Sequence, residues 1–259
     1  MMDVVVFAPH QDDEIIGCFH QIQKMQKNGS NINIIFTSNG NYKGEKISIV
    51  RYHESLQALK MCGIGARHIY YMGYDDTGMR MNHSFLWRLY KEADPFAVIQ
   101  AKHIHTWHPV EGMTLHKMYS GKEALFCKKN FEDDLEYALL HFNPDLILMP
   151  SRYDSHGDHK ALAYLLQETI HRLRLNIIYF CYLIHTSDEG LWPNRKGINY
   201  TKPNDLDDYL WNKRKSFFYS DKQRIIKREA IEKFITQNPF ENQSFLLSFA
   251  KREEFFLPF

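Results

Sequence analysis

Long apolar runs and paired cysteines are both missing from this 259-residue sequence. No stretch approaches the roughly 18 consecutive apolar residues of a transmembrane helix, and the first residues lack the basic region and the length of a signal peptide. We therefore expect a cytoplasmic protein without a membrane span. The 4 cysteines are scattered, which is typical of reduced, buried thiols and not of disulfides or a thiolate zinc site.

An excess of charge of one sign is missing as well. The formal net charge is +1, which argues against strong binding to nucleic acid or to an anionic membrane. No Gly-x-Gly-x-x-Gly or Walker sequence follows the first apolar run, so a nucleotide-binding module is disfavoured. A composition of 44% hydrophobic and 24% charged residues is that of an ordinary globular protein, and residues 1–259 require no second domain.

Short apolar runs alternate with segments of helical spacing along the chain. The runs occupy residues 4–7, 32–36, 69–72, 146–149 and 177–184. Runs without polar alternation are typical of strands that are buried on both faces of a parallel sheet. The pattern predicts an α/β fold with a Rossmann-like, doubly wound, mostly parallel sheet and helices on both of its faces.

The first apolar run ends in a cluster of residues that can bind a metal. His10, Asp12, Asp13 and Glu14 follow it at a strand-to-helix turn. Ligands of open α/β sheets lie beyond the carboxyl ends of strands, which makes this turn a candidate site. A simpler interpretation is that the acids only complement the dipole of the helix that follows.

The fourth apolar run ends in a second cluster, which contains Asp154, His156, Asp158 and His159. The two histidines are three residues apart and therefore point to similar sides, while the acids are close enough to orient imidazoles. One such histidine pair alone is more often an ordinary part of the protein surface than a metal site. Two strand ends of one sheet that both carry such residues predict a metal centre between them.

These two clusters resemble the signatures of the PIG-L/LmbE-like zinc-dependent N-acetylglucosaminyl deacetylases. The first signature is residues 8–14, APHQDDE, and the second is residues 156–159, HGDH. Residues 51–54 and 73–79 are similar to further segments of the family, so the resemblance extends over most of the chain. Gln11 stands where the family usually has proline, which concerns the rigidity of the turn and not the ligands.

The resemblance implies a hydrolase that removes the N-acetyl group from an N-acetylglucosamine-type sugar or conjugate. A bound Zn²⁺ would lower the pKa of a water molecule to about 7 and stabilise the oxyanion. The implied ligands of the zinc ion are His10, Asp13 and His159. The implied catalytic residues are Asp12 as general base, His156 as the imidazolium that stabilises the oxyanion and protonates the leaving amine, and Asp158 or Asp154 as the acid that holds the tautomer of His156. The expected substrate-binding residues are Arg51, Asp76 and His185.

Two other reactions remain open for the same residues. Two histidines and a carboxylate also describe the facial triad of non-haem Fe(II) oxygenases. Within hydrolysis, a metal-dependent amidase that acts on a non-sugar N-acyl substrate is the other possibility.

Arg51 and Glu54 also have a simpler interpretation. They could be no more than an ion pair across one helical turn.

Two segments are expected to complete the molecule. The irregular, histidine-containing segment 103–128 is interpreted as a substrate-binding rim over the cleft, because long irregular insertions tend to be functional loops. The C-terminal segment 205–259 is expected to be helical, and to pack over the edge of the sheet or form a contact in a homo-oligomer.

Overall fold

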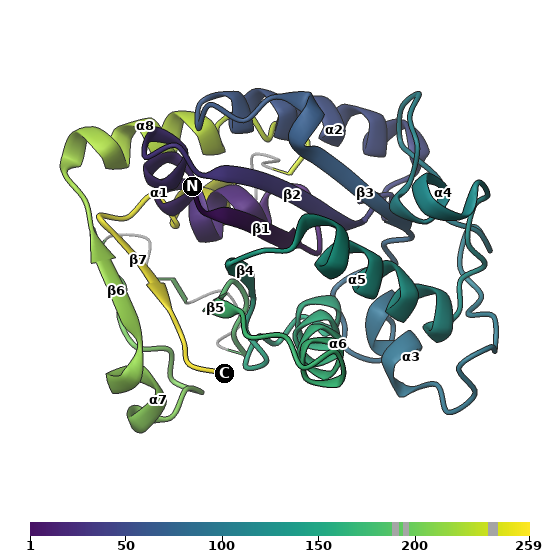
Figure 1. Cartoon of the computed structure of the whole chain (residues 1–259). Helices are drawn as coiled ribbons and strands as arrows, with labels where there is room; N and C mark the ends of the chain where they lie inside the picture. Colours follow the sequence, from purple (N-terminus) through teal and green to yellow (C-terminus); the bar gives the residue numbers. More distant parts are fainter. Residues whose placement is uncertain (188–191, 194–196, 238–242) are drawn as a thin grey trace.

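A five-stranded parallel sheet in the order β3-β2-β1-β4-β5 forms the centre of the computed structural model (Figure 1). The structure describes residues 1–187, 192–193, 197–237 and 243–259. The strands are β1 (Asp3–Ala8), β2 (Asn31–Ser38), β3 (Ile69–Tyr74), β4 (Leu146–Pro150) and β5 (Ile178–Tyr182). The Rossmann-like α/β prediction is therefore confirmed, with a strand at each predicted apolar run.

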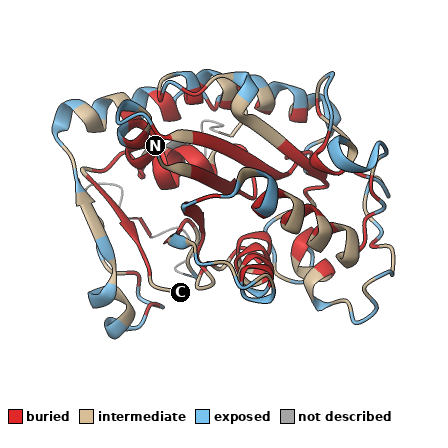
Figure 2. Cartoon of the chain, in the orientation of Figure 1, coloured by how far each residue is buried: buried red, intermediate tan, exposed pale blue. Residues whose placement is uncertain are grey.

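Helices cover both faces of this sheet (Figure 1). One face holds α1 (Asp13–Lys27), α2 (Glu45–Lys60) and α8 (Asp221–Ile231), and the other holds α3 (Phe85–Lys91), α5 (Lys128–Phe142) and α6 (Gly157–Arg172). Val4 and Val6 of β1 face the first layer, while Val5 and Phe7 face the second. All four are buried, as the central strands in Figure 2 show, which explains why the run has no polar alternation. The remaining short helices are η1 (Ala66–His68), α4 (Leu115–Ser120), α7 (Asp208–Lys213) and α9 (Gln243–Leu247).

The C-terminal segment is not purely helical, so that part of the prediction for 205–259 is wrong. It contains the antiparallel strands β6 (Lys215–Phe218) and β7 (Glu253–Phe256) in addition to helices. Strands of this length are too short to leave a period-two signal in the sequence. Just beyond β7 the N–H of Leu257 donates to the carbonyl of Cys181, so the tail lies along the edge strand β5. Among the described helices, none has both the length and the apolar character that a membrane span requires.

A buried ion pair ties this C-terminal segment to α1. Lys227 of α8 lies 2.9 Å from Glu254 of β7, and both side chains are buried. The Lys227 ammonium also donates to the carbonyl of Ile16, and the Glu254 carboxylate accepts from the N–H groups of His20 and Gln21. The pair therefore bonds backbone groups in the middle of the helix whose first residue is Asp13.

Replacing Lys227 with methionine is expected to reduce the free energy of unfolding by about 3–5 kcal/mol, because it leaves the Glu254 carboxylate buried without its counter-ion. Denaturant unfolding measures the change. Arg228→Met is the matched control, since Arg228 pairs with Glu232 at the surface and should cost no more than about 1 kcal/mol. Equal stabilities of the two variants would contradict the importance of the pair.

Candidate metal centre

The turn after β1 is held in a strained conformation. Asp12 has a φ of 142° and precedes α1, whose Ile15 and Ile16 N–H groups donate to its carbonyl. This φ lies in the left-handed region that favours glycine, so keeping aspartate there costs about 1–3 kcal/mol. Residues in such conformations tend to occur where the side chain has a function, which supports a role for the Asp12 carboxylate.

The turn after β4 is organised by side-chain to backbone hydrogen bonds. His156 caps α6 because its Nδ1 accepts from the N–H of Asp158 at 3.1 Å. Asp154 accepts from the N–H of His156, at 2.8 Å, and from the N–H groups of Ile184 and His185 after β5. These bonds place His159 in the first turn of α6, next to the turn after β1.

The two turns meet because β1 and β4 are neighbours in the sheet, and their helices leave to opposite faces. The strand order reverses at this point, and open α/β sheets bind ligands in the crevice that such a reversal creates. Ligand atoms of His10, Asp13 and His159 lie within 4.8 Å of one another, and all three side chains are buried. Asp13 Oδ2 is 3.4 Å from His10 Nδ1 and 3.2 Å from His159 Nε2.

The chemistry of this cluster suits a divalent cation. Neither ring nitrogen of His159 forms an aligned hydrogen bond, although Nε2 is close to Asp13 and Nδ1 is 3.1 Å from Asp154. Burial alone would lower the pKa of His159, but Asp13 and Asp154 raise it to about 10. The surroundings therefore stabilise positive charge at this point, and two imidazoles with a carboxylate are ligands that zinc accepts.

A carboxylate lies beside each of the two histidines of the cluster, on the side away from Asp13. Asp158 is 3.2 Å from His10 Nε2 and also accepts from Ser84 Oγ and Leu86 N. Asp154 occupies the equivalent position near His159 Nδ1. Such partners fix the ring orientation of metal-binding histidines. This differs from the expectation that Asp158 or Asp154 would hold the His156 ring through a carboxylate, because among the described residues that ring accepts from the backbone N–H of Asp158.

His156 and His185 lie beside the cluster of His10, Asp13 and His159. His156 also has a ring nitrogen within 4.8 Å of ligand atoms of His10 and Asp158, a second group that could hold a metal. The His156 ring is 4.8 Å from that of His10 and 5.2 Å from that of His185. Burial, together with the neighbouring His10 and His159, lowers the pKa of His156 well below its usual value. The hydrogen bond that Nδ1 accepts from the N–H of Asp158 favours a neutral imidazole with its ring proton on Nε2, whereas the resemblance implied an imidazolium.

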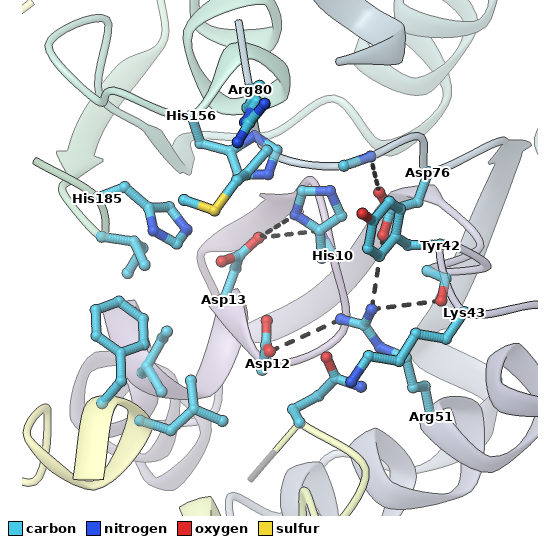
Figure 3. A pocket seen from close by; sticks show the side chains of 18 of the residues that line it. His10, Asp12, Asp13, Tyr42, Lys43, Arg51, Asp76, Arg80, His156 and His185 are labelled. Atoms are coloured by element: carbon cyan, nitrogen blue, oxygen red, sulfur yellow. Dashed lines mark hydrogen bonds and ion pairs between the residues drawn. The ribbon is translucent and has the colours of Figure 1, made fainter. Parts of the chain in front are cut away.

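Arg51 of α2 connects the two remaining predicted carboxylates. Its guanidinium lies 3.7 Å from both Asp12 and Asp76 (Figure 3). It also donates to the carbonyl of Gln11 at 3.0 Å. Burial raises the pKa of Asp12 to about 7, against the lowering effect of Arg51. A carboxyl group with such a pKa can exchange a proton near neutrality.

One pocket with a volume of about 900 Å³ is lined by His10, Asp12, Asp13, Arg51, Asp76, His156 and His185, whereas Asp154, Asp158 and His159 are not among its lining residues. Figure 3 shows Tyr42, Lys43 and Arg80 around it, three residues that the sequence analysis did not identify. Tyr42 and Lys43 follow the small polar end of β2, and Arg80 follows the Gly78 turn. Their role could have been suggested by the position of these turns after β2 and β3, the two strands on one side of β1.

The segment 103–128 does not form the predicted rim, since no residue of it is among the described residues that line the pocket. It supports the rim from behind. Asp75 accepts from the backbone N–H of His103 and from the Trp107 indole, and it also accepts from the side-chain amide of Asn41. Lys102, just before the segment, donates to the carbonyls of Asn41 and Tyr42. The histidines of this segment therefore signalled structural contacts, not substrate contacts.

The Rossmann-like sheet and the buried histidine–carboxylate cluster at its strand reversal define an α/β protein with a candidate metal centre. The family model PIG-L, described as GlcNAc-PI de-N-acetylase, matches residues 5–170, which is more than half of the chain, and the chain belongs to this family. De-N-acetylases are hydrolases that act on amide bonds, so the predicted family and enzyme class are confirmed.

Solved structures share this fold at low sequence identity. The A40926 pseudoaglycone deacetylase Dbv21 superposes with a TM-score of 0.61 at 12% identity, over 99% of this chain and 96% of that chain. The N,N'-diacetylchitobiose deacetylase from Pyrococcus horikoshii gives 0.58 at 15% identity, over 98% and 83%. A 4-carboxy-2-hydroxymuconate hydratase from Pseudomonas putida gives 0.51 at 14% identity, over 96% and 83%, so the fold alone does not define the reaction. No curated protein matches the sequence.

The cluster predicts about one divalent metal ion per chain, which elemental analysis of the purified protein would detect. The double variant His10→Ala, His159→Ala should lose it, because Asp13 is then the only one of the three proposed ligands that remains. The double variant His53→Ala, His171→Ala changes two exposed histidines and should retain the metal. Full metal content in the first variant would exclude this site.

Proposed function

We propose that the chain is a zinc-dependent hydrolase that removes the N-acetyl group from an N-acetylglucosamine-type sugar or sugar conjugate. The observation that carries the proposal is the placement of Asp12 and His156 on two sides of His10 and Asp13 in one pocket, as Figure 3 presents them. Family membership supports deacetylation, and the deacetylase acting on N,N'-diacetylchitobiose supports an acetamido sugar as the substrate.

A divalent ion held by His10, Asp13 and His159 would supply a water molecule of lowered pKa and positive charge for the acyl oxygen. Asp12 accepts the proton of the attacking water, because burial has already raised its pKa to about 7. Arg51 keeps the Asp12 carboxylate in place, at 3.7 Å. The Asp13 carboxylate accepts a hydrogen bond from the backbone N–H of His10 at 2.9 Å, so we assign it no part in this proton transfer.

His156 serves as a hydrogen-bond donor to the developing oxyanion. Its Nδ1 is occupied by the N–H of Asp158, so its single ring proton, on Nε2, is the one it can donate. The departing amine also needs a proton, and the proton that Asp12 took up is the one that can be returned to it. This assignment replaces the imidazolium role for His156 that the resemblance implied.

The rest of the pocket favours a sugar with a further group attached. A volume of about 900 Å³ lies in the upper part of the range of ordinary ligand pockets, roughly 300–1,000 Å³. Asp76 and Arg51 are placed to bind hydroxyl groups, and the exposed ring of Tyr42 offers a flat face to a pyranose. A conjugate would fill this space better than a monosaccharide.

Asp12→Asn is expected to retain the metal and to lose about 10²–10⁴-fold in turnover, since it removes only the proton-accepting group. Metal content and kcat measured on the same preparation test this directly. If the variant lost its metal instead, Asp12 and not Asp13 would be the ligand.

The metal-loaded protein is expected to release acetate from a panel of N-acetylglucosamine, N,N'-diacetylchitobiose and glycolipid head groups, without oxygen present. Asp76→Ala should weaken the use of sugars and keep the metal, whereas Asp133→Ala, at a surface ion pair, should change neither. Release of acyl groups only from non-sugar amides would show a broader amidase, and strict dependence on oxygen with iron would show an oxygenase.

A further inference from the structure

Glu54 is a buried carboxylate that the proposed chemistry does not use. It lies on α2, one turn after Arg51, and is 6% exposed. Within the described part of the chain it forms no ion pair with Arg51 or any other cation. Its two oxygens instead accept from a single residue of the C-terminal segment, Thr236, from the N–H at 2.8 Å and from the hydroxyl at 2.5 Å. The expectation of an Arg51–Glu54 ion pair is therefore not met.

This double contact fixes the backbone of a distant segment. Glu54 and Thr236 are 182 positions apart in the sequence, and a carboxylate that holds both a backbone N–H and the side chain of one residue sets its position and its orientation. Without these hydrogen bonds, burial of the Glu54 carboxylate would substantially reduce the free energy of unfolding. The contact therefore determines where the following residue, Gln237, is placed.

Gln237 lines the same pocket as Asp12, Arg51 and Asp76. One N–H of its side-chain amide donates to Thr236 Oγ1 at 2.9 Å, which orients the amide. The amide oxygen and the second N–H have no partner among the described residues. An oriented amide with a free acceptor and a free donor in a polar pocket is suited to bind a hydroxyl group of a sugar.

We infer that Gln237 is a specificity-determining residue that contacts a hydroxyl of the substrate, and that Glu54 is its positioning residue, acting through Thr236. The inference rests on the proposed function for the nature of the substrate. It assigns the C-terminal segment, which lies outside the residues matched by the family model, a part in substrate recognition.

Steady-state kinetics of the metal-loaded full chain with N-acetylglucosamine and N,N'-diacetylchitobiose test the inference. Gln237→Ala should raise KM about 2- to 12-fold, the range that corresponds to one net hydrogen bond, with kcat and metal content unchanged. Glu54→Gln and Thr236→Val should raise KM in the same way. Glu232→Gln is the matched control, since it makes the same chemical change at an exposed ion pair nearby and should leave KM unchanged.

The double variant Glu54→Gln, Gln237→Ala separates positioning from a general effect on stability. If Glu54 acts through Gln237, the double variant should have the KM of Gln237→Ala alone, within about a factor of two. An additive increase of KM would overturn the positioning role. An unchanged KM in Gln237→Ala, with active wild-type enzyme, would overturn the inference alone. A wild-type enzyme that hydrolysed no acetamido sugar would overturn the proposed function, and the inference with it.

Discussion

The neighbouring positions of β1 and β4 are the constraint on which the rest of the site depends. Because these strands run parallel and lie side by side, the turn of residues 9–12 and the turn of residues 151–156 open at the same edge. The helices that follow leave to opposite faces, so no helix fills the space between the turns. A strand in any other position would move His159 away from His10 by at least one further strand spacing, about 4.8 Å.

Charge balance explains why a cation belongs in this space. Three buried carboxylates, Asp13, Asp154 and Asp158, surround two imidazoles, His10 and His159. Buried charges are tolerated only where they are paired or coordinate a metal. Protonated imidazoles can compensate part of this charge, since Asp13 and Asp154 raise the pKa of His159 to about 10. A divalent ion could replace these protons and use the same nitrogen and oxygen atoms. Asp154 and Asp158 thus have two effects: they orient the imidazole rings, and their negative charge favours the binding of a cation.

The sequence predicted the parts of this arrangement that depend on local pattern. Unalternated apolar runs located every strand of the main sheet, and the polar residues after two of them located His10, Asp13 and His159. It could not predict that Asp158 faces His10, because that orientation depends on Ser84 and Leu86, which a separate helix start supplies. For the same reason the sequence did not predict where the segment 103–128 lies relative to the pocket. Histidines in a loop carry no pattern that indicates whether they face a cleft or pack against the residues that line it.

The helix α2 illustrates how one element can join groups that no sequence pattern connects. Its Arg51 holds the turn after β1 through Gln11 and Asp12, and one helical turn later its Glu54 holds Thr236. An i,i+3 pair on a helix surface faces the same direction, and opposite charges there would ordinarily satisfy each other. Here each charge is turned to a different partner, so the helix fixes the turn after β1 and the C-terminal wall of the pocket relative to one another. A substitution on α2 that rotated or shifted the helix would therefore disturb both at once, although neither lies within α2 itself.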